Sequence, residues 1–207
     1  MSSGFDDDIF RITPLAIDIN DTRGVRAADM TSTALSHMEK KISLSRVLVC
    51  GASYRQDVGD TRYSGSEIIV RRLAELGAKV TAHDPYVKSW PELADQHSDP
   101  HGKMKFFENQ DQLSSLEVNS DLKDCLSGVD AILLAVPHSE YCNLDPDDLL
   151  QEVGSPFAII DCLLKQWLIH QVNGHVINII SHHLSVNFPI YSTQGIKNTF
   201  KTSFLCS

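Results

Sequence analysis

Two arginines, Arg55 and Arg62, stand in a polar loop between an apolar run that ends at Gly51 and a helix start at Ser64. A guanidinium group binds phosphate oxygens through paired hydrogen bonds. A helix N-terminus adds unpaired N–H groups and the positive end of the helix dipole. The spacing of these residues therefore predicts a site for a phosphate-bearing ligand.

Apolar runs alternate with amphipathic segments along the middle of the chain. Such alternation predicts a parallel sheet wound by right-handed crossovers, with helices on its faces. The run 131–136 is apolar throughout, as a central strand covered on both faces should be. The expected strands are 46–51, 79–83, 130–136 and 157–161, with a short strand at 104–107, and the expected helices are 64–77, 121–127 and 145–153.

A long helix is expected before the sheet, because residues 9–42 have apolar side chains at helical spacing. Gly24 separates its two apolar runs and is expected to be a weak point. Ser64 and Glu67 have the spacing of a capping box, and Gly77 is expected to end the helix that Ser64 begins. The predicted fold class is α/β, a Rossmann-like parallel sheet with flanking helices, preceded by a long helix.

The carboxyl ends of parallel strands are where ligands of such sheets bind. That edge would gather the loop 51–62, Asp84, His138 and the pair 161–162. Asp84 follows a strand, where a Rossmann fold places its ribose-binding acid, but the Pro85 that comes next favours a structural turn. His138 is expected either to contact a ligand or, as is commoner for a lone histidine, to be hydrogen-bonded within its loop.

The composition limits the classes of function. The net charge is −9, and a duplex needs a basic face, so nucleic acid is not an expected partner. No run reaches about 18 apolar residues, so no membrane span is expected. The five cysteines form no CxxC pair, and the acidic, polar start is unlike a secretory leader, which predicts reduced thiols and a cytoplasmic location. His182 and His183 have no acid or cysteine near them, so no metal site is expected.

The last part of the chain has a different composition. Residues 1–162 contain 15 Lys+Arg and all 27 Asp+Glu, whereas residues 163–207 contain three lysines and no acid. The break predicts a sequence that was not selected with the rest, such as a frameshifted or alternatively spliced end. A short membrane-surface segment is the alternative. Without a last strand, one edge of the sheet would be exposed and prone to aggregation, and the C-terminal end of the domain incomplete.

Several motifs occur here in the order found in one known family. They are Gly51-x-x-Tyr54-Arg55-x-Asp57-x-Gly59-Asp60-Thr61-Arg62-x-Ser64, Leu76-Gly77-Ala78-Lys79-Val80, Asp84-Pro85-Tyr86-Val87, Asp130-Ala131-Ile132-Leu133-Leu134-Ala135-Val136-Pro137-His138 and Ile159-Ile160-Asp161-Cys162. Together they resemble the C-terminal domain of the UDP-glucose/GDP-mannose dehydrogenase family. Residues 9–42 are similar to the end of that family's long central helix. The chain departs from the family pattern after Cys162.

The resemblance implies an oxidoreductase that uses NAD to oxidise the C6 alcohol of a nucleotide sugar to a carboxylate in two hydride transfers. It implies that Tyr54 and Arg55 bind the nucleotide-sugar substrate, the aromatic face covering a ring and the guanidinium meeting a pyrophosphate oxygen. It implies that Arg62 reaches toward the NAD cofactor and that the N-terminal helix builds homo-oligomers. The family's GxGxxG loop and its Gly-rich cysteine segment are missing from this sequence, so no catalytic residue is expected here.

Several residues have a structural alternative. Arg55 would otherwise be a surface arginine, and Arg62 would pair with Asp57 or Asp60. Asp60 and Thr61 are expected to shape the turn and cap the helix. The thiols of Cys50 and Cys162 are expected to be inert, because a thiol on an apolar strand has a raised pKa. The acids at the start of one helix, Asp145, Asp147 and Asp148, are expected to be solvated.

The sequence thus predicts three regions: residues 1–43 as the end of a central dimerisation helix, 44–162 as the UDP-binding domain, and 163–207 as a divergent tail that is disordered or non-native. The expected function is the substrate-binding part of a nucleotide-sugar 6-dehydrogenase that does not turn over alone. The alternatives are a non-catalytic nucleotide-sugar-binding or dimerisation fragment, and a chain of marginal stability.

Overall fold

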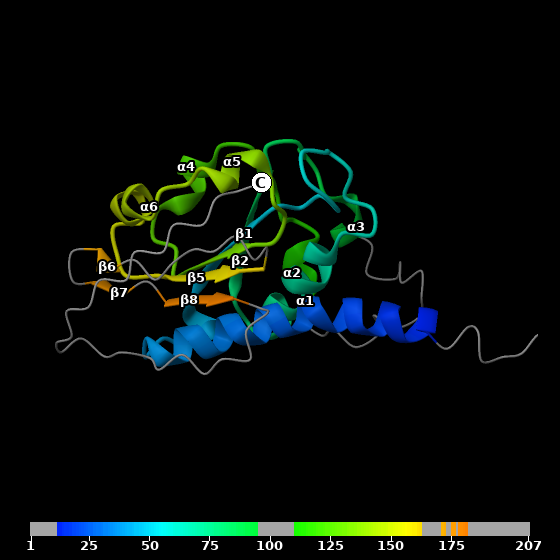
Figure 1. Ribbon diagram of the computed structural model, residues 1–207, viewed down its shortest axis with the longest axis horizontal. Helices are drawn as coiled ribbons and strands as arrows, with labels where there is room; N and C mark the ends of the chain where they lie inside the picture. The colour runs from blue at the N-terminus through cyan, green and yellow to red at the C-terminus, as the bar shows by residue number, and fades with distance from the viewer. Residues whose placement is uncertain (1–11, 95–109, 163–170, 173–174, 177, 182–207) are drawn as a thin grey trace, which may run out of the picture.

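A computed structural model describes residues 12–94, 110–162, 171–172, 175–176 and 178–181 of the chain (Figure 1). Its centre is a six-stranded sheet in the order β3-β2-β1-β4-β5-β8, in which every neighbouring pair is parallel. The strands are β1 Arg46–Cys50, β2 Lys79–His83, β3 Val118–Asn119, β4 Ala131–Leu134, β5 Ala158–Asp161 and β8 Asn178–Ser181. A separate antiparallel pair joins β6 Gln171–Val172 to β7 His175–Val176.

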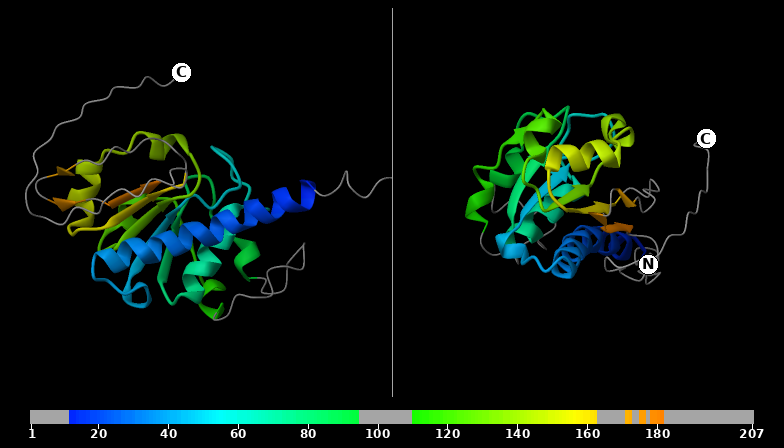
Figure 2. Two further views of the ribbon diagram at one scale, coloured as in Figure 1. Left: turned by 60° about the horizontal axis from the view of Figure 1, so that its bottom comes forward. Right: turned by 90° about the vertical axis from the view of Figure 1, so that its left-hand side faces the viewer.

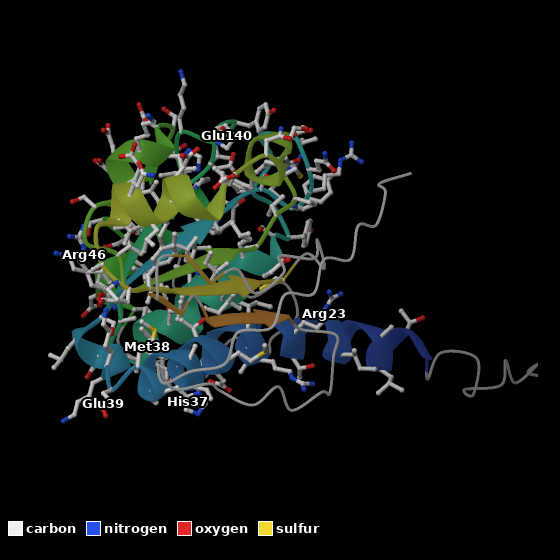
Figure 3. All side chains as sticks on the ribbon, turned by 60° about the vertical axis from the view of Figure 1, so that its left-hand side comes forward. Arg23, His37, Met38, Glu39, Arg46 and Glu140 are labelled. Carbon is white, nitrogen blue, oxygen red and sulfur yellow. The ribbon has the colours of Figure 1, made fainter. Side chains whose placement is uncertain are left out.

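Helices cover both faces of the sheet (Figure 2). The long helix α1 and the helix α2 lie on one face, and α4, α5 and α6 lie on the other. Figure 3 shows the same division, with Arg23 and His37 of α1 on the side of the sheet opposite Glu140 of α5. The helices are α1 Ile12–His37, α2 Gly65–Glu75, α3 Pro91–Ala94, α4 Leu122–Leu126, α5 Ser139–Cys142 and α6 Pro146–Val153, with short 3₁₀ turns η2 Ile42–Leu44 and η3 Asp111–Leu113.

The alternation of side chains along β1 explains the two layers. Val47 and Val49 point to a core shared with α1 and α2, whereas Leu48 and Cys50 point to a second core shared with α4 and α6. All four side chains are fully buried. Successive residues of a strand face opposite sides of its sheet, so an entirely apolar strand needs a cover on both.

Gly24 is a contact point between two helices and does not interrupt α1. It lies inside α1, which is continuous from Ile12 to His37. A Cβ added at Gly24 would stand 2.8 Å from the Cβ of Ile68 on α2. A side chain at this position would push the two helices apart, so the glycine permits their close approach.

The N-terminal half of α1 extends past the sheet (Figure 1) and presents apolar side chains to solvent. Leu15 is 59% exposed and Ile19 is 55% exposed, whereas Ala34 and Leu35 nearer the other end are completely buried. The apolar spacing predicted one helix, and among the described residues its second half is the part that other elements cover.

The predicted strands 46–51, 79–83, 130–136 and 157–161 and the three predicted helices are confirmed with small changes of boundary. The expected exposed edge is not found at β5, because β8 pairs with β5 from Ala158↔Asn178 to Asp161↔Ser181. The expected strand at 104–107 lies outside the described residues, as do His182 and His183.

The start and end of α2 agree largely with the sequence. Ser64 is its N-cap, and the Ser64 Oγ accepts from the backbone N–H of Ser66. Gly77 has a φ of +83° and follows the last turn. The second half of the expected capping box differs, because the Ser64 N–H donates to the carbonyl of Thr61 and the Glu67 carboxylate accepts from Arg71.

Candidate functional site

The carboxyl ends of β2, β1 and β4 bring three loops together. Between β1 and β4 the strand order changes direction, which is the place where ligands of such sheets bind. The chain turns sharply at Gly51, whose φ is +102°. A Cβ on Gly51 would stand 2.5 Å from the Cβ of Val136, so only glycine lets the loop after β1 pass so close to the loop after β4.

Asp84 is the centre of this edge, and its side chain is fully buried. Its Oδ2 accepts from the backbone N–H groups of Ala52 at 2.8 Å and Ser53 at 3.0 Å, and its Oδ1 accepts from the N–H of Tyr86 at 2.8 Å. Burial alone would raise the pKa of Asp84, but the hydrogen bonds from His138 and these N–H groups outweigh it and lower the pKa to about 2. Asp84 therefore forms the structural turn, and its oxygens are already occupied.

His138 joins the three loops. Its side chain is fully buried. The Nε2 lies 3.1 Å from Asp84 Oδ2 and 3.0 Å from Ser53 Oγ, and the Nδ1 accepts from the backbone N–H of Asp57 at 2.8 Å. His138 is thus the hydrogen-bonded loop histidine of the two alternatives, and it lies beneath the predicted binding loop.

Asp57 clamps the tip of the binding loop onto α5. Its carboxylate accepts from the Ser139 N–H at 2.9 Å and from the Ser139 Oγ at 2.6 Å. These hydrogen bonds lower the pKa of Asp57 to about 2. Asp57 has a φ of +55°, a left-handed conformation that is uncommon for residues other than glycine but that asparagine and aspartate adopt more often than most. The clamp holds this backbone in place.

The outer face of the loop presents the predicted substrate-binding residues. Tyr54 is 46% exposed, and the Arg55 guanidinium lies 5.5 Å from the centre of the Tyr54 ring. Among the described residues, Arg55 forms no ion pair. Tyr86, 48% exposed, stands on the neighbouring loop. The positive charge of Arg55 and the aromatic rings of Tyr54 and Tyr86 are therefore available to a ligand at the sheet edge.

Arg62 has the structural partner that the sequence offered as its alternative. Its Nε and its Nη2 donate to the two carboxylate oxygens of Asp60 at 2.9 and 2.6 Å. The pair lowers the pKa of Asp60 to about 2. Arg62 remains 75% exposed, and a contact with NAD stays a prediction. Asp60 also accepts from the Arg62 N–H and so shapes the turn, as expected.

The helix N-terminus next to this loop is already partly satisfied. Ser64 Oγ accepts from the Ser66 N–H at 3.2 Å and donates to the carbonyl of Ser53 at 3.0 Å. Thr61, expected to help to cap α2, instead donates to Glu92 of α3 at 2.7 Å. Binding of a phosphate at this helix end stays a prediction. The Arg55 guanidinium is the nearby group that forms no ion pair among the described residues and can donate hydrogen bonds to a phosphate.

This sheet edge does not fit NAD. A dinucleotide loop has the pattern G-x-G-x-x-G, and here the second and third glycine positions are Ser53 and Gln56. The loops after β1 and β4 are hydrogen-bonded directly to one another through Ser53, Asp57 and His138, and Asp84 has no exposed oxygen for a ribose. The glycine loop and the ribose-binding acid of a dinucleotide site are therefore not formed by these residues.

The described cysteines are free thiols. Burial raises the pKa of Cys50 well above its ordinary value and the pKa of Cys162 to about 12, the direction expected for both. Cys50 lies on β1 as predicted, whereas Cys162 follows the end of β5. Within the described part of the chain, no group of His, Cys, Asp and Glu could hold a metal ion. No described helix is long and apolar enough to span a bilayer.

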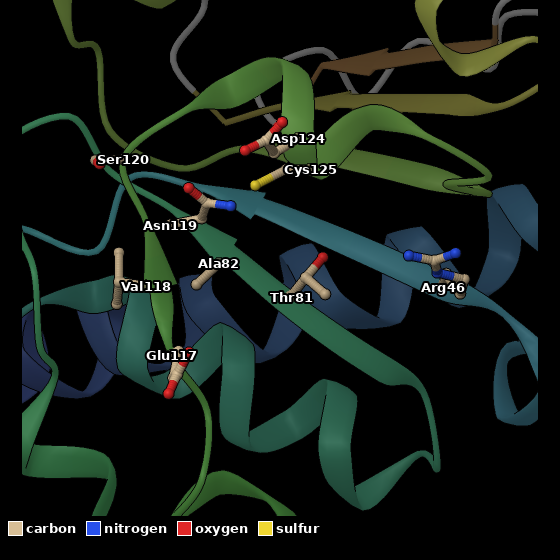
Figure 4. Close-up of a pocket in the computed structure, with 9 residues that line it drawn as sticks. All are labelled: Arg46, Thr81, Ala82, Glu117, Val118, Asn119, Ser120, Asp124 and Cys125. Carbon is tan, nitrogen blue, oxygen red and sulfur yellow. The ribbon is translucent and has the colours of Figure 1, made fainter.

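A separate hollow of about 420 Å³ lies along β2 and β3, next to α4 (Figure 4). Arg46, Thr81, Glu117, Asn119 and Cys125 are among its lining residues. None of the predicted binding residues Tyr54, Arg55 and Arg62 lines this hollow. The hollow is therefore an alternative ligand site to the loop.

The sequence did not single out Asp57, Ser53, Ser139 or Tyr86 as parts of the site's frame. A signal was present: Ser53, Asp84 and His138 each follow a strand within a few residues, and the ends of parallel strands share one edge. Three short polar side chains at that edge should have predicted a buried network.

The fold and the edge define a Rossmann-like α/β domain with a basic, aromatic loop at its strand switch point. Residues 48–165 match the model of the "UDP-glucose/GDP-mannose dehydrogenase family, UDP binding domain". This match covers more than half of the chain, and the chain belongs to the UDP-glucose/GDP-mannose dehydrogenase family.

Relatives agree with that assignment. A UDP-N-acetyl-D-mannosamine dehydrogenase of Methanococcus maripaludis is 29% identical over 59% of this chain and 23% of its own length. A UDP-glucose 6-dehydrogenase of Caenorhabditis elegans is 25% identical over 70% of this chain and 28% of its own length. The chain therefore spans about a quarter of the length of these curated relatives.

Solved structures show the same fold. The crystal structure of NDP-N-acetyl-D-galactosaminuronic acid dehydrogenase from Methanosarcina mazei Go1 has a TM-score of 0.59 and 26% identity, over 78% of this chain and 28% of that one. A UDP-D-ManNAc dehydrogenase from Pyrococcus horikoshii has a TM-score of 0.60 at 22% identity, over 86% of this chain and 35% of that one, and shows the fold alone.

Proposed function

We propose that this chain is the nucleotide-sugar-binding part of a nucleotide-sugar 6-dehydrogenase, in which Tyr54 and Arg55 bind the substrate. In the complete enzyme the sugar C6 alcohol would be oxidised to a carboxylate with NAD as hydride acceptor. The described cysteines are free thiols, which supports a reducing compartment, the cytoplasm, as the place of action.

One observation supports this proposal most strongly: a buried network fixes the loop while its charged and aromatic side chains face solvent. Asp84 and His138 hold the loop from beneath, and Arg55 remains without an ion pair among the described residues. Guanidinium groups bind diphosphate oxygens bidentately, and a tyrosine ring can cover a sugar or base. A fixed loop loses little conformational entropy when it binds.

Calorimetry on the full chain tests the proposal. UDP-glucose is expected to bind, and Arg55→Ala is expected to weaken its affinity about tenfold, because one charge-assisted bidentate contact is lost. Arg26→Ala is the matched control, since Arg26 is an exposed arginine on α1, and its affinity should equal that of the unmodified chain. Absence of binding, or equal losses in both variants, contradicts the proposal.

The chain alone is expected not to turn over. The described residues include no dinucleotide glycine loop. Burial raises the pKa of the Cys50, Cys125 and Cys162 thiols, whereas a covalent oxidation step would need a thiolate. Incubation at high protein concentration with UDP-glucose and NAD should yield no NADH above background. Steady NADH production would contradict this part of the proposal.

A second candidate function is assembly through α1, supported by the exposed Leu15 and Ile19. An apolar helix face outside the domain that it leads into is suited to packing against a second copy of this chain or an intact subunit. Light scattering is expected to give the mass of an oligomer that Ile19→Asp converts to monomer. A monomeric unmodified chain that also fails to co-purify with a full-length dehydrogenase would contradict assembly.

A further inference from the structure

The hydrogen bonds of His138 fix the position of its ring proton. The backbone N–H of Asp57 is a permanent donor, and it points at Nδ1 at 2.8 Å. Nδ1 must therefore be the unprotonated, accepting nitrogen, which places the single proton of the neutral ring on Nε2. There it lies between two acceptors, Asp84 Oδ2 at 3.1 Å and Ser53 Oγ at 3.0 Å.

A second proton on this ring is incompatible with the loop as it stands. A proton on Nδ1 would face the Asp57 N–H donor to donor, and that hydrogen bond would be lost. The nearest alternative acceptor is the Asp57 carboxylate, whose Oδ1 lies 3.5 Å from Nδ1. That oxygen already accepts from the Ser139 N–H at 2.9 Å, so the cationic ring would compete for the group that clamps the loop to α5.

Other ionisable groups also face the ring. Asp84 and Asp57 stand on its two nitrogen sides. The rings of Tyr86, after β2, and Tyr141, on α5, lie 5.1 and 5.4 Å from it, centre to centre. The Cys142 Sγ, also on α5, donates to the carbonyl of His138 at 3.3 Å. A second proton on the ring would therefore change the hydrogen bonds of the Asp57 clamp.

We infer that His138 is a positioning residue that holds the loop 54–60 only as the neutral Nε2–H tautomer, and that its second protonation releases this loop. The inference deepens the proposed function and rests on it for one consequence: nucleotide-sugar affinity falls as the ring takes up a proton. Tyr54 and Arg55 then lose the fixed backbone that presents them to a ligand.

Two substitutions separate positioning from simple filling of space. His138→Asn keeps a side-chain oxygen near the Nδ1 position as an acceptor for the Asp57 N–H, but it does not titrate. His138→Phe keeps the ring volume and removes the acceptor. His37→Asn is the matched control, because His37 is an exposed histidine on α1. Calorimetry with UDP-glucose is run at two pH values, a higher one at which NMR shows the His138 ring neutral and a lower one at which NMR shows both ring nitrogens protonated.

The unmodified chain and His37→Asn are expected to bind at least about fivefold more weakly at the lower pH. His138→Asn should bind within about threefold of the unmodified chain at the higher pH and show no pH response, and His138→Phe should be about tenfold weaker at both. A His138→Asn variant that keeps the pH response, or a His138→Phe variant with full affinity, would overturn the inference.

A readout without ligand separates this inference from the proposed function. In NMR spectra of the unmodified chain, the Asp57 amide resonance is expected to shift together with the titrating His138 ring, and His138→Asn should abolish that shift. If UDP-glucose does not bind at any pH, the proposed function fails, and the inference on the loop is decided by this titration alone. An Asp57 amide that ignores the His138 titration would overturn it.

Discussion

The two sides of the loop 51–62 differ in almost every physical property. On the inner side, Ser53, Asp84 and His138 are completely buried and share their hydrogen bonds with one another. On the outer side, Tyr54 and Arg62 are exposed, and the only ion pair of Arg62 among the described residues is with its near neighbour Asp60. The inner side fixes the backbone, and the outer side is free to meet a ligand.

This difference indicates that stability and binding are separable along one short loop. A buried donor or acceptor that loses its partner retains the full free-energy penalty of its desolvation, whereas an exposed one regains water. Substitutions on the inner side should therefore change the free energy of unfolding. Substitutions on the outer side should change affinity and leave stability almost unaltered.

The largest effect is expected from Asp84→Ala. It leaves the N–H groups of Ala52, Ser53 and Tyr86 and the His138 ring without their buried acceptor. The free energy of unfolding, measured with urea at pH 7, should fall by at least about 3 kcal/mol. Asp60→Ala removes an outer carboxylate and should leave the urea midpoint nearly unchanged. Equal losses in the two variants would erase the distinction between the two sides.

A somewhat smaller effect is expected from Gly51→Ala. The new Cβ would need a φ of +102° and a place 2.5 Å from the Cβ of Val136, which should lower the free energy of unfolding by about 2–3 kcal/mol. Gly65→Ala is the control, because no atom lies within 4 Å of its added Cβ. That variant, at the start of α2, should be neutral or slightly stabilised. Thermal unfolding of the two variants measures both changes in stability.

The pH dependence of stability should show the contribution of Asp84. Its pKa is lowered to about 2 in the folded chain, below the unfolded value of about 3.9. Its stabilisation is therefore complete above the unfolded pKa and is lost as the pH falls from about 5 to about 2. The loss is on the order of 2 kcal/mol. Urea unfolding over this range should give a shallower slope for Asp84→Asn, and identical slopes would refute the assignment.

The smallest effect is expected from Arg62→Ala. Its exposed pair with Asp60 should not measurably change the urea midpoint, since such pairs add little in water. Affinity for UDP-glucose should stay within about twofold of the unmodified chain, because the resemblance directs Arg62 toward the cofactor and not toward the substrate. A tenfold loss of affinity would place Arg62 on the outer binding face beside Arg55.

Much of the fold could be predicted from the sequence, because its signals are local. The apolar run at β4, the Ser64 cap and Gly77 each express a local preference of strand, helix start or turn. Features that depend on distant partners were not predicted. Gly24 is explained only by Ile68 on another helix, and β8 is found only through its pairing with β5.

The candidate site divides in the same manner. Tyr54 and Arg55 could be named from their residue types and from the family motif. The binding chemistry of an exposed side chain depends on its own functional group and not on partners elsewhere in the fold. The strand ends indicate that Asp84 and His138 share an edge with the loop of Asp57, but the individual hydrogen bonds could not be named, because these residues are 27 to 81 positions apart along the chain. Their roles are defined by hydrogen-bond geometry, which no single stretch of sequence encodes.

Backbone NMR of the full chain, titrated with UDP-glucose, is the most direct test of the outer face of this loop as the ligand site. The account predicts amide shifts concentrated at residues 53–62 and at Tyr86, with the hollow around Thr81, Asn119 and Cys125 unaffected. Shifts confined to that hollow, or none at saturating ligand, would contradict it.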